Sequence, residues 1–303
     1  MSTITNNNNQ IIRFDGHALT AIPSQAESDQ QLVDLWLHGR PKTTQRVYRR
    51  DANRFMQFVN RPLHGVTLGD LQAFADALGA EALEPSSRHR MLSAIKSLFA
   101  FGHRIGYLPF DIARVLRLPP LREKLSERIL SEVEVQRMLA LERHPRNLAI
   151  LYLLYASGIR VSECCSLRWR DLQSREGTNG GGQITVQAKG AKTNTILIPR
   201  SVWLKLMSLR QEEPQDAPLF RSRRGGALDS SQMFRIVNNA AKRADIDKDV
   251  SPHWMRHAHA SHALEHGAPI HLVQATLAHA SINTTGRYLH ARPSDGSARF
   301  LPL

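Results

Sequence analysis

The chain has 303 residues, enough for about two domains that each bury a hydrophobic core. Its 40 lysine and arginine residues outnumber its 27 aspartate and glutamate residues, and the resulting net charge of +13 favours an anionic partner, above all nucleic acid. The longest apolar run, 148–156, is shorter than the roughly 18 residues of a membrane-spanning helix, so a membrane protein is not expected. The two cysteines, Cys164 and Cys165, are neighbours and offer neither a disulfide framework nor the spacing of a metal site.

The N-terminal segment 1–24 is polar and contains an asparagine run at 6–9. It has no basic start followed by an apolar stretch, so it does not resemble a secretory signal. We therefore expect a disordered tail and a cytoplasmic protein, associated with the nucleoid if DNA is its partner.

Two amphipathic helices are predicted next, over 44–59 and over 87–103, because apolar residues recur there at steps of three and four. The other faces of these helices are basic. We interpret their charges as DNA phosphate contacts rather than as a merely solvated surface. The side chains concerned are Lys42, Arg46, Arg49, Arg50, Arg88, Arg90 and Lys96.

The segment 114–128 combines two prolines with five arginine or lysine residues, which is typical of an extended basic linker. Ser131 and Glu134 after it form the pattern of a helix-starting capping box. The expected organisation is a tail, an N-terminal domain, a linker and a second domain. Their boundaries are 1–24, 25–113, 114–128 and 129–303.

Within the second domain, the apolar stretch 147–156 predicts a helix that ends at Gly158. The segment 183–199 alternates around a short polar turn with lysines, which predicts a β-hairpin with a lysine at its tip. The remaining segments have helical patterns. The expected class is therefore mainly α, with a small antiparallel sheet.

Ser251 and Pro252 form a favourable helix start, which places His253 and Arg256 one turn apart on the same face. A helix N-terminus carries partial positive charge and free amides, so an anion held by these two side chains would be stabilised there. This helix is expected to end at Gly267. A further helix is expected to open at Pro269 and to reach His279, and a short polar stretch, 281–285, leads to Tyr288.

These segments contain five motifs whose order and spacing resemble those of the tyrosine recombinases, in particular the bacterial Xer recombinases and related integrases. The motifs are Ala156-Ser-Gly-Ile-Arg160 with Glu163 and Leu167, Val186-Gln-Ala-Lys189-Gly, Ser251-Pro-His-Trp-Met-Arg256-His, Leu277-Ala-His279 and Thr284-Thr-Gly-Arg-Tyr288. The resemblance implies an N-terminal SAM-like helical bundle that clamps DNA and a mostly helical catalytic domain. It also implies a site-specific recombinase or integrase that acts on double-stranded DNA as a homotetramer or hetero-tetramer on paired sites.

Position by position, the resemblance implies a catalytic set of Arg160, Lys189, His253, Arg256, His279 and Tyr288. Lys192 also lies in the hairpin turn, but the position in the motif favours Lys189. In this interpretation the phenol attacks a phosphodiester and forms a 3′-phosphotyrosyl intermediate. Because that bond retains the energy of the broken one, neither ATP, nor a metal, nor another cofactor is expected.

Each residue type suits its implied role. Two planar guanidiniums, Arg160 and Arg256, can clamp the phosphate oxygens on which charge develops. His253 can accept the phenol proton, and His279 can donate one more hydrogen bond. A lysine can release a proton to the leaving 5′ oxygen, which an arginine cannot.

Two positions depart from the family pattern. Ala278 stands where glycine usually precedes the histidine, and we expect a tolerated shift of the backbone behind His279. Gly286 lies two residues before Tyr288 and should weaken a helix there by about 1 kcal/mol relative to alanine, so we expect a mobile nucleophile segment.

Three alternatives stay open. A type IB topoisomerase would use the same chemistry without pairing two sites, and a non-catalytic DNA-binding protein would never form a covalent adduct. The third is a zinc protease, because His262, Glu265 and His266 form an H-x-x-E-H pattern. Only Asp295 could supply a later carboxylate ligand, so we prefer to interpret these histidines, with His257, His259 and His271, as surface groups that face DNA.

Overall fold

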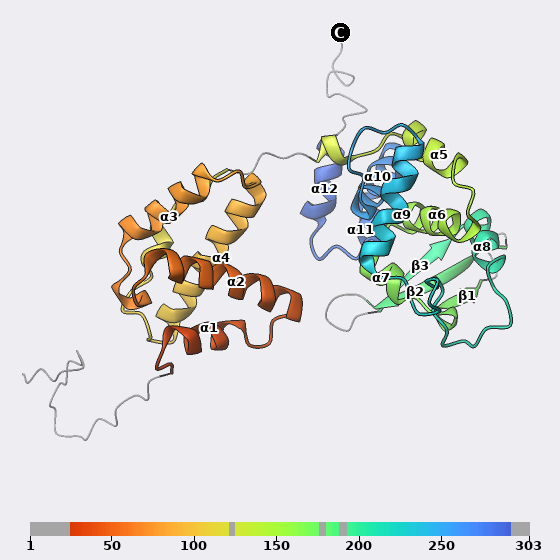
Figure 1. Cartoon of the computed structure of the whole chain (residues 1–303). Helices are drawn as coiled ribbons and strands as arrows, with labels where there is room; N and C mark the ends of the chain where they lie inside the picture. Colours follow the sequence, from red (N-terminus) through yellow and green to blue (C-terminus); the bar gives the residue numbers. More distant parts are fainter. Residues whose placement is uncertain (1–24, 121–124, 176–179, 188–192, 292–303) are drawn as a thin grey trace, which may run out of the picture. The chain divides into compact units, whose positions relative to one another are not determined.

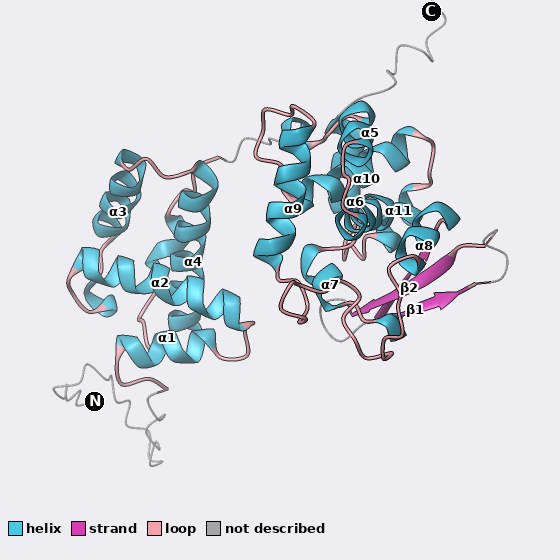
Figure 2. Cartoon of the chain, turned by 45° about the vertical axis from the view of Figure 1, so that its right-hand side comes forward, coloured by secondary structure: helices cyan, strands magenta, loops and turns pink. Residues whose placement is uncertain are grey.

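The computed structural model describes residues 25–120, 125–175, 180–187 and 193–291. The predicted tail, 1–24, and the predicted catalytic Lys189 with its neighbour Lys192 lie outside these residues. The described chain divides into two compact units, with the division near residue 122. Figure 1 shows both units, and Figure 2 shows that helices dominate them. The domain and linker boundaries expected from the sequence remain predictions.

Helices are the only regular secondary structure among the described residues of unit 1. Its elements are α1 (Asp29–Leu37), α2 (Lys42–Val59), η1 (Leu63–Gly65), α3 (Leu68–Ala80), α4 (Pro85–Arg104) and η2 (Ile112–Val115). The two amphipathic helices predicted at 44–59 and 87–103 are present as α2 and α4, each starting two residues earlier than expected. Pro85 lies in the first turn of α4, where backbone amides have no partner inside the helix. A proline has no amide hydrogen and is therefore well suited to this position, which explains the earlier start of α4.

An aromatic cluster forms the centre of unit 1. The ring of Phe55 packs edge-on against Phe74 at 5.1 Å and against Phe99 at 5.9 Å, which joins α2 to α3 and α4. Beside this cluster, the carboxylate of Asp51 is fully buried and pairs with the guanidinium of Arg90. A buried carboxylate needs such a partner, so Arg90 contributes to the packing of α2 on α4.

The start of the segment expected to be an extended linker packs onto unit 1 instead. The short helix η2 contacts α4, and Leu116 after it is buried in the core. The ammonium of Lys96 donates hydrogen bonds to the carbonyls of Arg114, at 2.9 Å, and Leu116, at 2.5 Å. Arg90 and Lys96 are therefore half-buried rather than exposed as the sequence pattern suggested.

Unit 2 is mostly helical with one small sheet. Its helices are η3 (Ser126–Arg128), α5 (Glu132–Ala140), α6 (Pro145–Ser157), α7 (Val161–Ser166), η4 (Trp169–Asp171), α8 (Arg200–Met207), α9 (Ser230–Arg243), α10 (Pro252–Glu265), α11 (Ile270–Thr276) and α12 (Ile282–Ala291). The predicted capping box at Ser131 is confirmed, since its hydroxyl accepts from the Glu134 amide and the Glu134 carboxylate accepts from the Ser131 amide.

The sheet of unit 2 contains β1 (Leu172–Ser174), β2 (Gly182–Gln187) and β3 (Thr193–Ile198), antiparallel and in that order. The two strands of the predicted hairpin are thus confirmed as β2 and β3. Ile184 pairs with Ile196 across the hairpin, and both are buried, so one face of the sheet joins the core that contains α6 and α8. Figure 2 shows the sheet beside α8.

Helix α10 lies in the middle of unit 2 and contacts α5, α6, α9, α11 and α12. Its position lets residues on one face of the helix reach several neighbouring elements at once. In the described ranges, no helix combines the length and the apolar character that crossing a bilayer would demand.

The turn after α11 is a Schellman motif. The amide of Ala278 donates to the carbonyl of Ala275, and that of His279 donates to the carbonyl of Gln274. This motif requires a left-handed residue, and Ala278 adopts a φ of +47°. The departure from glycine that the sequence shows at this position therefore imposes strain, which costs an alanine about 1 kcal/mol.

Helix α12 continues through Gly286 to Ala291, so Tyr288 lies within a helix and not after a polar loop as expected. The buried Thr285 and Tyr288 lie one turn apart on its inner face, and Tyr288 packs in a small cluster with Val273 and Leu277. Tertiary packing thus outweighs the low helix propensity of the glycine.

We predict that Ala278→Gly stabilises unit 2 by about 0.5 to 1 kcal/mol, because glycine adopts a positive φ without strain. Urea unfolding followed by tryptophan fluorescence measures this change in the variant Trp36→Phe, since the other three tryptophans, Trp169, Trp203 and Trp254, lie in unit 2. The matched control is Ala275→Gly inside α11, which should destabilise by about 1 kcal/mol. Equal losses of stability in both variants would show that Ala278 is unstrained in solution.

Candidate active site

The start of α10 builds the centre of the site. Ser251 has the extended backbone of an N-cap, and Pro252 occupies the first turn, as predicted. His253, Arg256 and His257 follow at positions i, i+3 and i+4, which lie on one face of a helix. His253 is exposed, Arg256 is buried and His257 is half-buried, so the face runs from solvent into the protein.

The guanidinium of Arg256 is held by two backbone carbonyls. Nη1 donates to the carbonyl of Gly158, and Nη2 donates to the carbonyl of Leu277, both at 2.6 Å. Burial and the positive charge of Arg160 lower the pKa of Arg256 to about 10, so it stays protonated at neutral pH. The Gly158 carbonyl that binds Arg256 lies two residues before Arg160 in the chain, which places both arginines in the same region of unit 2.

Gly158 makes this arrangement possible. It ends α6 with a φ of +59°, and a Cβ atom there would lie 2.6 Å from Leu277 and 2.7 Å from the ring of His259. Only glycine permits this close approach of α6 to the turn after α11. The ring of His259 also binds the Tyr155 carbonyl through Nδ1 at 2.8 Å, which places this histidine in the interior.

Arg160 is the N-cap of α7. Its amide donates to Glu163 Oε2 at 2.7 Å, and its Nη1 donates to Glu163 Oε1 at 2.8 Å. The Glu163 side chain is buried, whereas 36% of the Arg160 side chain is exposed. Arg160 is therefore held in place while part of its side chain stays accessible to solvent.

His279 follows the strained Ala278 and is oriented by α12. Its Nδ1 atom lies 2.8 Å from the hydroxyl of the buried Thr285. Burial and the charges of Arg256 and Arg160 lower the pKa of His279 to about 4, so the ring is neutral at pH 7. A neutral ring bound through Nδ1 leaves Nε2 for another partner.

The phenol of Tyr288 lies among these groups. Its hydroxyl is 2.8 Å from Nδ1 of His257, and its ring is parallel to that of His279 with 6.5 Å between the centroids. The side chain is buried, with 6% of its surface exposed. Burial raises the pKa of Tyr288, whereas the charges of Arg256 and Arg287 oppose that rise.

His253 lies at the outer end of the same face. Its ring packs edge-on against His257 with 4.7 Å between the centroids. Partial burial, together with the charges of Arg256, Arg160 and Arg128, lowers its pKa. The structure thus brings together five of the six residues that the sequence singled out, and the sixth, Lys189, is outside the described residues.

Two polar residues that touch this site were missed by the sequence analysis: His257, which contacts the phenol, and Thr285, which contacts His279. The expectation that His257 and His259 are surface groups was wrong, because both rings are largely enclosed and hydrogen-bonded. The sequence could have indicated His257, because it lies four residues after His253 on a predicted helix and therefore on the same face. No local pattern pointed to Thr285.

The H-x-x-E-H pattern does not form a zinc site in the structure. Both ring nitrogens of His262 are engaged, Nδ1 with the Tyr155 hydroxyl and Nε2 with the Leu130 carbonyl, each at 2.9 Å. The carboxylate of Glu265 accepts from Ser261. Among the described residues there is no group of three or more histidine, cysteine or acidic side chains able to hold a metal ion.

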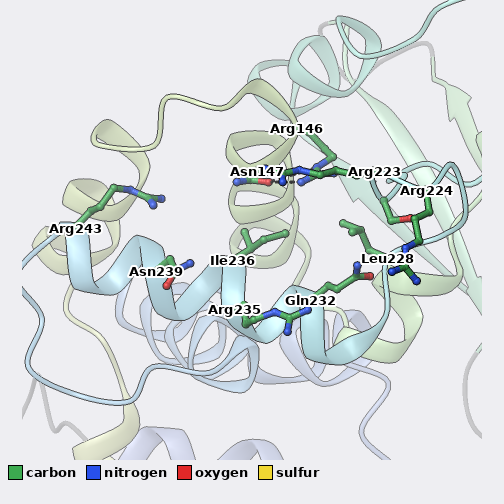
Figure 3. Close-up of a pocket in the computed structure, with 11 residues that line it drawn as sticks. Arg146, Asn147, Arg223, Arg224, Leu228, Gln232, Arg235, Ile236, Asn239 and Arg243 are labelled. Atoms are coloured by element: carbon green, nitrogen blue, oxygen red, sulfur yellow. Dashed lines mark hydrogen bonds between the residues drawn. The ribbon is translucent and has the colours of Figure 1, made fainter.

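A second basic feature, missed from the sequence, is a pocket of about 620 Å³ along α9 (Figure 3). Five arginines line it: Arg146, Arg223, Arg224, Arg235 and Arg243. Figure 3 shows Arg235 and Arg243 on α9, with Arg146 and Arg223 across the pocket from it. The run Arg221-Ser-Arg-Arg224 just before a helix start at Asp229 was the sequence signal for it.

Two of these five arginines have partners within the protein. Arg146 donates to the Arg221 carbonyl at 2.6 Å, and Arg243 pairs with Glu142. The other three, Arg223, Arg224 and Arg235, are exposed and make no ion pair within the described parts of the chain. This pocket therefore presents uncompensated positive charge.

The predicted basic residues of unit 1 differ in exposure and in the partners that they bind. Lys42, Arg46 and Arg50 are exposed, although Arg50 approaches Asp51 at 3.7 Å. Arg88 is half-buried, and the others bind partners in unit 1: Arg49 pairs with Asp34 at 2.5 Å, Arg90 with Asp51, and Lys96 with two carbonyls. Their assignment to DNA stays a prediction.

Family models match both units. The model described as "Phage integrase family" matches residues 128–295, and that of the "Phage integrase, N-terminal SAM-like domain" matches residues 30–106. The chain is 30% identical to tyrosine recombinase XerD of Vibrio cholerae serotype O1, over 88% of this chain and 92% of that protein. It is 32% identical to tyrosine recombinase XerD of Ralstonia nicotianae, over 88% and 91% of the two proteins.

Solved structures share the fold. A lambda integrase dimer bound to a COC′ core site matches with a TM-score of 0.71 and 17% identity, over 89% of this chain and 79% of that one. The XerH recombinase bound to its difH substrate matches with a TM-score of 0.67 and 20% identity, over 91% and 84%. The family models and the XerD relatives show that this chain belongs to the phage integrase family of tyrosine recombinases.

Proposed function

We propose that Tyr288 cleaves a DNA strand by attacking a backbone phosphodiester, which forms a 3′-phosphotyrosyl bond and releases a 5′ hydroxyl. The observation that supports this most is the gathering of Tyr288, Arg256 and Arg160 at one place. A phenol with a pKa of about 10 is deprotonated in roughly one molecule in a thousand at pH 7, which costs about 4 kcal/mol. Burial of Tyr288 raises its pKa and adds to that cost, and the positive charges of Arg256 and Arg287 offset part of it.

In this proposal the two arginines bind the non-bridging phosphate oxygens, on which negative charge develops during attack. His253 and His279 contribute further hydrogen bonds to the substrate, and Lys189 donates the proton that the leaving 5′ oxygen needs. The reverse attack by a 5′ hydroxyl reseals the strand. The covalent bond conserves the energy, so resealing requires no nucleotide hydrolysis.

The partner in this proposal is double-stranded DNA, and four protomers act on paired sites to exchange strands. The relatives support it: one solved neighbour is described as a dimer bound to its core site, and another as bound to its substrate. The arginine pocket along α9 would bind backbone phosphates, because α9 packs against α7, which begins directly after Arg160. Such work on chromosomal DNA would place the protein with the nucleoid in the cytoplasm.

We predict that Tyr288→Phe abolishes covalent attachment to DNA, because phenylalanine has no nucleophile. Wild-type protein is first trapped on host DNA and the attached sequences are read, which identifies the site. A synthetic duplex of that site, nicked so that the released end diffuses away, then reports adduct formation on a denaturing gel. Tyr152→Phe, half-buried in the same unit, is the matched control and should form the adduct. An adduct with Tyr288→Phe would place the nucleophile elsewhere.

We predict that replacing Arg223, Arg224 and Arg235 together by glutamine weakens DNA binding. The slope of the logarithm of the DNA association constant against the logarithm of the salt concentration should become shallower by about one for each phosphate that is no longer neutralised. A binding titration at several salt concentrations measures this slope. Arg170→Gln, which removes an arginine already paired with Asp216, is the control and should leave the slope unchanged. An unchanged slope in the triple variant would remove the pocket from the DNA interface.

In unit 1 we predict a contrast between exposed and internally bound cations. Replacing Lys42, Arg46 and Arg50 by glutamine should make the salt slope shallower by about one for each of these cations that binds a phosphate. Lys96→Gln should instead lower the urea midpoint with little change of slope, because its ammonium serves two carbonyls of the protein. The reverse result would assign Lys96 to the DNA interface and the other three to solvent.

A further inference from the structure

The Tyr288 hydroxyl contacts a single described side chain by hydrogen bond, His257 Nδ1 at 2.8 Å. The two rings are tilted, with 5.7 Å between their centroids. Within the described residues, neither His253 nor His279 makes a hydrogen bond to the phenol; His253 packs on His257, and His279 uses Nδ1 to bind Thr285. A nucleophile and a base within hydrogen-bond reach are the geometry that proton abstraction requires.

We propose that His257 is a further catalytic residue, which accepts the Tyr288 proton through Nδ1 as the phenol attacks. The inference rests on the proposed function of Tyr288 and deepens it. It differs from the role that the motif resemblance gave to His253, whose ring in this structure packs against His257 rather than binding the phenol.

The proton transfer conserves atoms and charge. The O–H bond of Tyr288 breaks and an N–H bond forms on His257 Nδ1, while the phenol oxygen bonds to phosphorus. The bond from phosphorus to the 5′ oxygen breaks, and that oxygen takes the proton proposed to come from Lys189. In resealing, the 5′ hydroxyl attacks the phosphotyrosine and gives its proton back to Lys189, and His257 returns its proton to the departing phenol oxygen.

The surroundings of His257 suit this role once DNA is bound. Burial lowers its pKa to about 3, and the groups that face it from α10, η3 and α12 add to this effect: His253, Arg128, Arg256 and Arg287. The ring is therefore neutral at pH 7 and can accept a proton. A phosphate anion beside these cations would favour the protonated imidazole, so substrate binding itself would strengthen the base.

His257→Asn separates proton transfer from positioning, because the asparagine amide can keep a hydrogen bond to the phenol but cannot take up its proton. His257→Ala removes both functions. The matched control is His266→Asn, the same change at an exposed position just after α10. Each variant is checked by urea unfolding and by non-covalent DNA binding. Adduct formation on the nicked duplex is then measured in single turnover across a pH series.

We expect His257→Asn and His257→Ala to form the adduct about 100-fold or more slowly than wild type, the lower end of general-base contributions. Their rates should rise about tenfold per pH unit, since the phenolate must then form by release of its proton to solvent. A fluorinated tyrosine at position 288, which has a lower phenol pKa, should recover much of the missing rate in His257→Asn. His266→Asn should match wild type.

Three results would overturn the role of His257. Faster cleavage in the His257 variants would show that its bond to Tyr288 only restrains the nucleophile. A normal rate in His257→Asn with a slow rate in His257→Ala would show positioning alone. A uniform decrease of rate without a change of pH profile or recovery by fluorotyrosine would show a structural defect. In each case Tyr288→Phe separately decides the proposed function, because an adduct formed by that variant would remove the nucleophile itself.

Discussion

The buried guanidinium of Arg256 is the contact on which the site depends, because it joins the C-terminal ends of two helices to the start of a third. The carbonyls of Gly158 and Leu277 receive its hydrogen bonds. Carbonyls at helix C-termini lack partners within their helix and carry partial negative charge, so a cation suits them. Without them the buried charge would cost roughly several kcal/mol. The packing of α6, α10 and α11 and the position of the Arg256 guanidinium therefore depend on each other.

The same arrangement explains why the histidines of the site are neutral. Arg160 and Arg256 both contribute positive charge to the site, and the carboxylate of Glu163 pairs with Arg160. Burial and positive charge depress the pKa of His257 and His279 to about 3 and 4. Neutral rings can accept or donate a proton, whereas imidazolium rings could only donate. An anionic phosphate would supply negative charge that this cluster lacks, which links binding of the substrate to the protonation state of the rings.

The distinction between charges that serve the fold and charges that face solvent runs through both units. Arg90 pairs with the buried Asp51, and Arg243 pairs with Glu142, so these cations stabilise packing. Arg223 and Arg235 in the α9 pocket have no such partner among the described residues. The 40 lysine and arginine residues therefore include cations that pair inside the protein, and the uncompensated positive charge lies on particular surfaces such as the α9 pocket.

The sequence by itself determined the fold class, the capping box at Ser131, the hairpin strands and the family, because these follow from local periodicity, cap chemistry and motif order. It also named Tyr288 and Arg256. Only the tertiary structure decided that the phenol meets His257, that Ala278 adopts a left-handed turn, and which arginines are already paired. The physical reason is that these features depend on how segments distant in the chain pack together, and no local pattern records which atoms meet when helices pack.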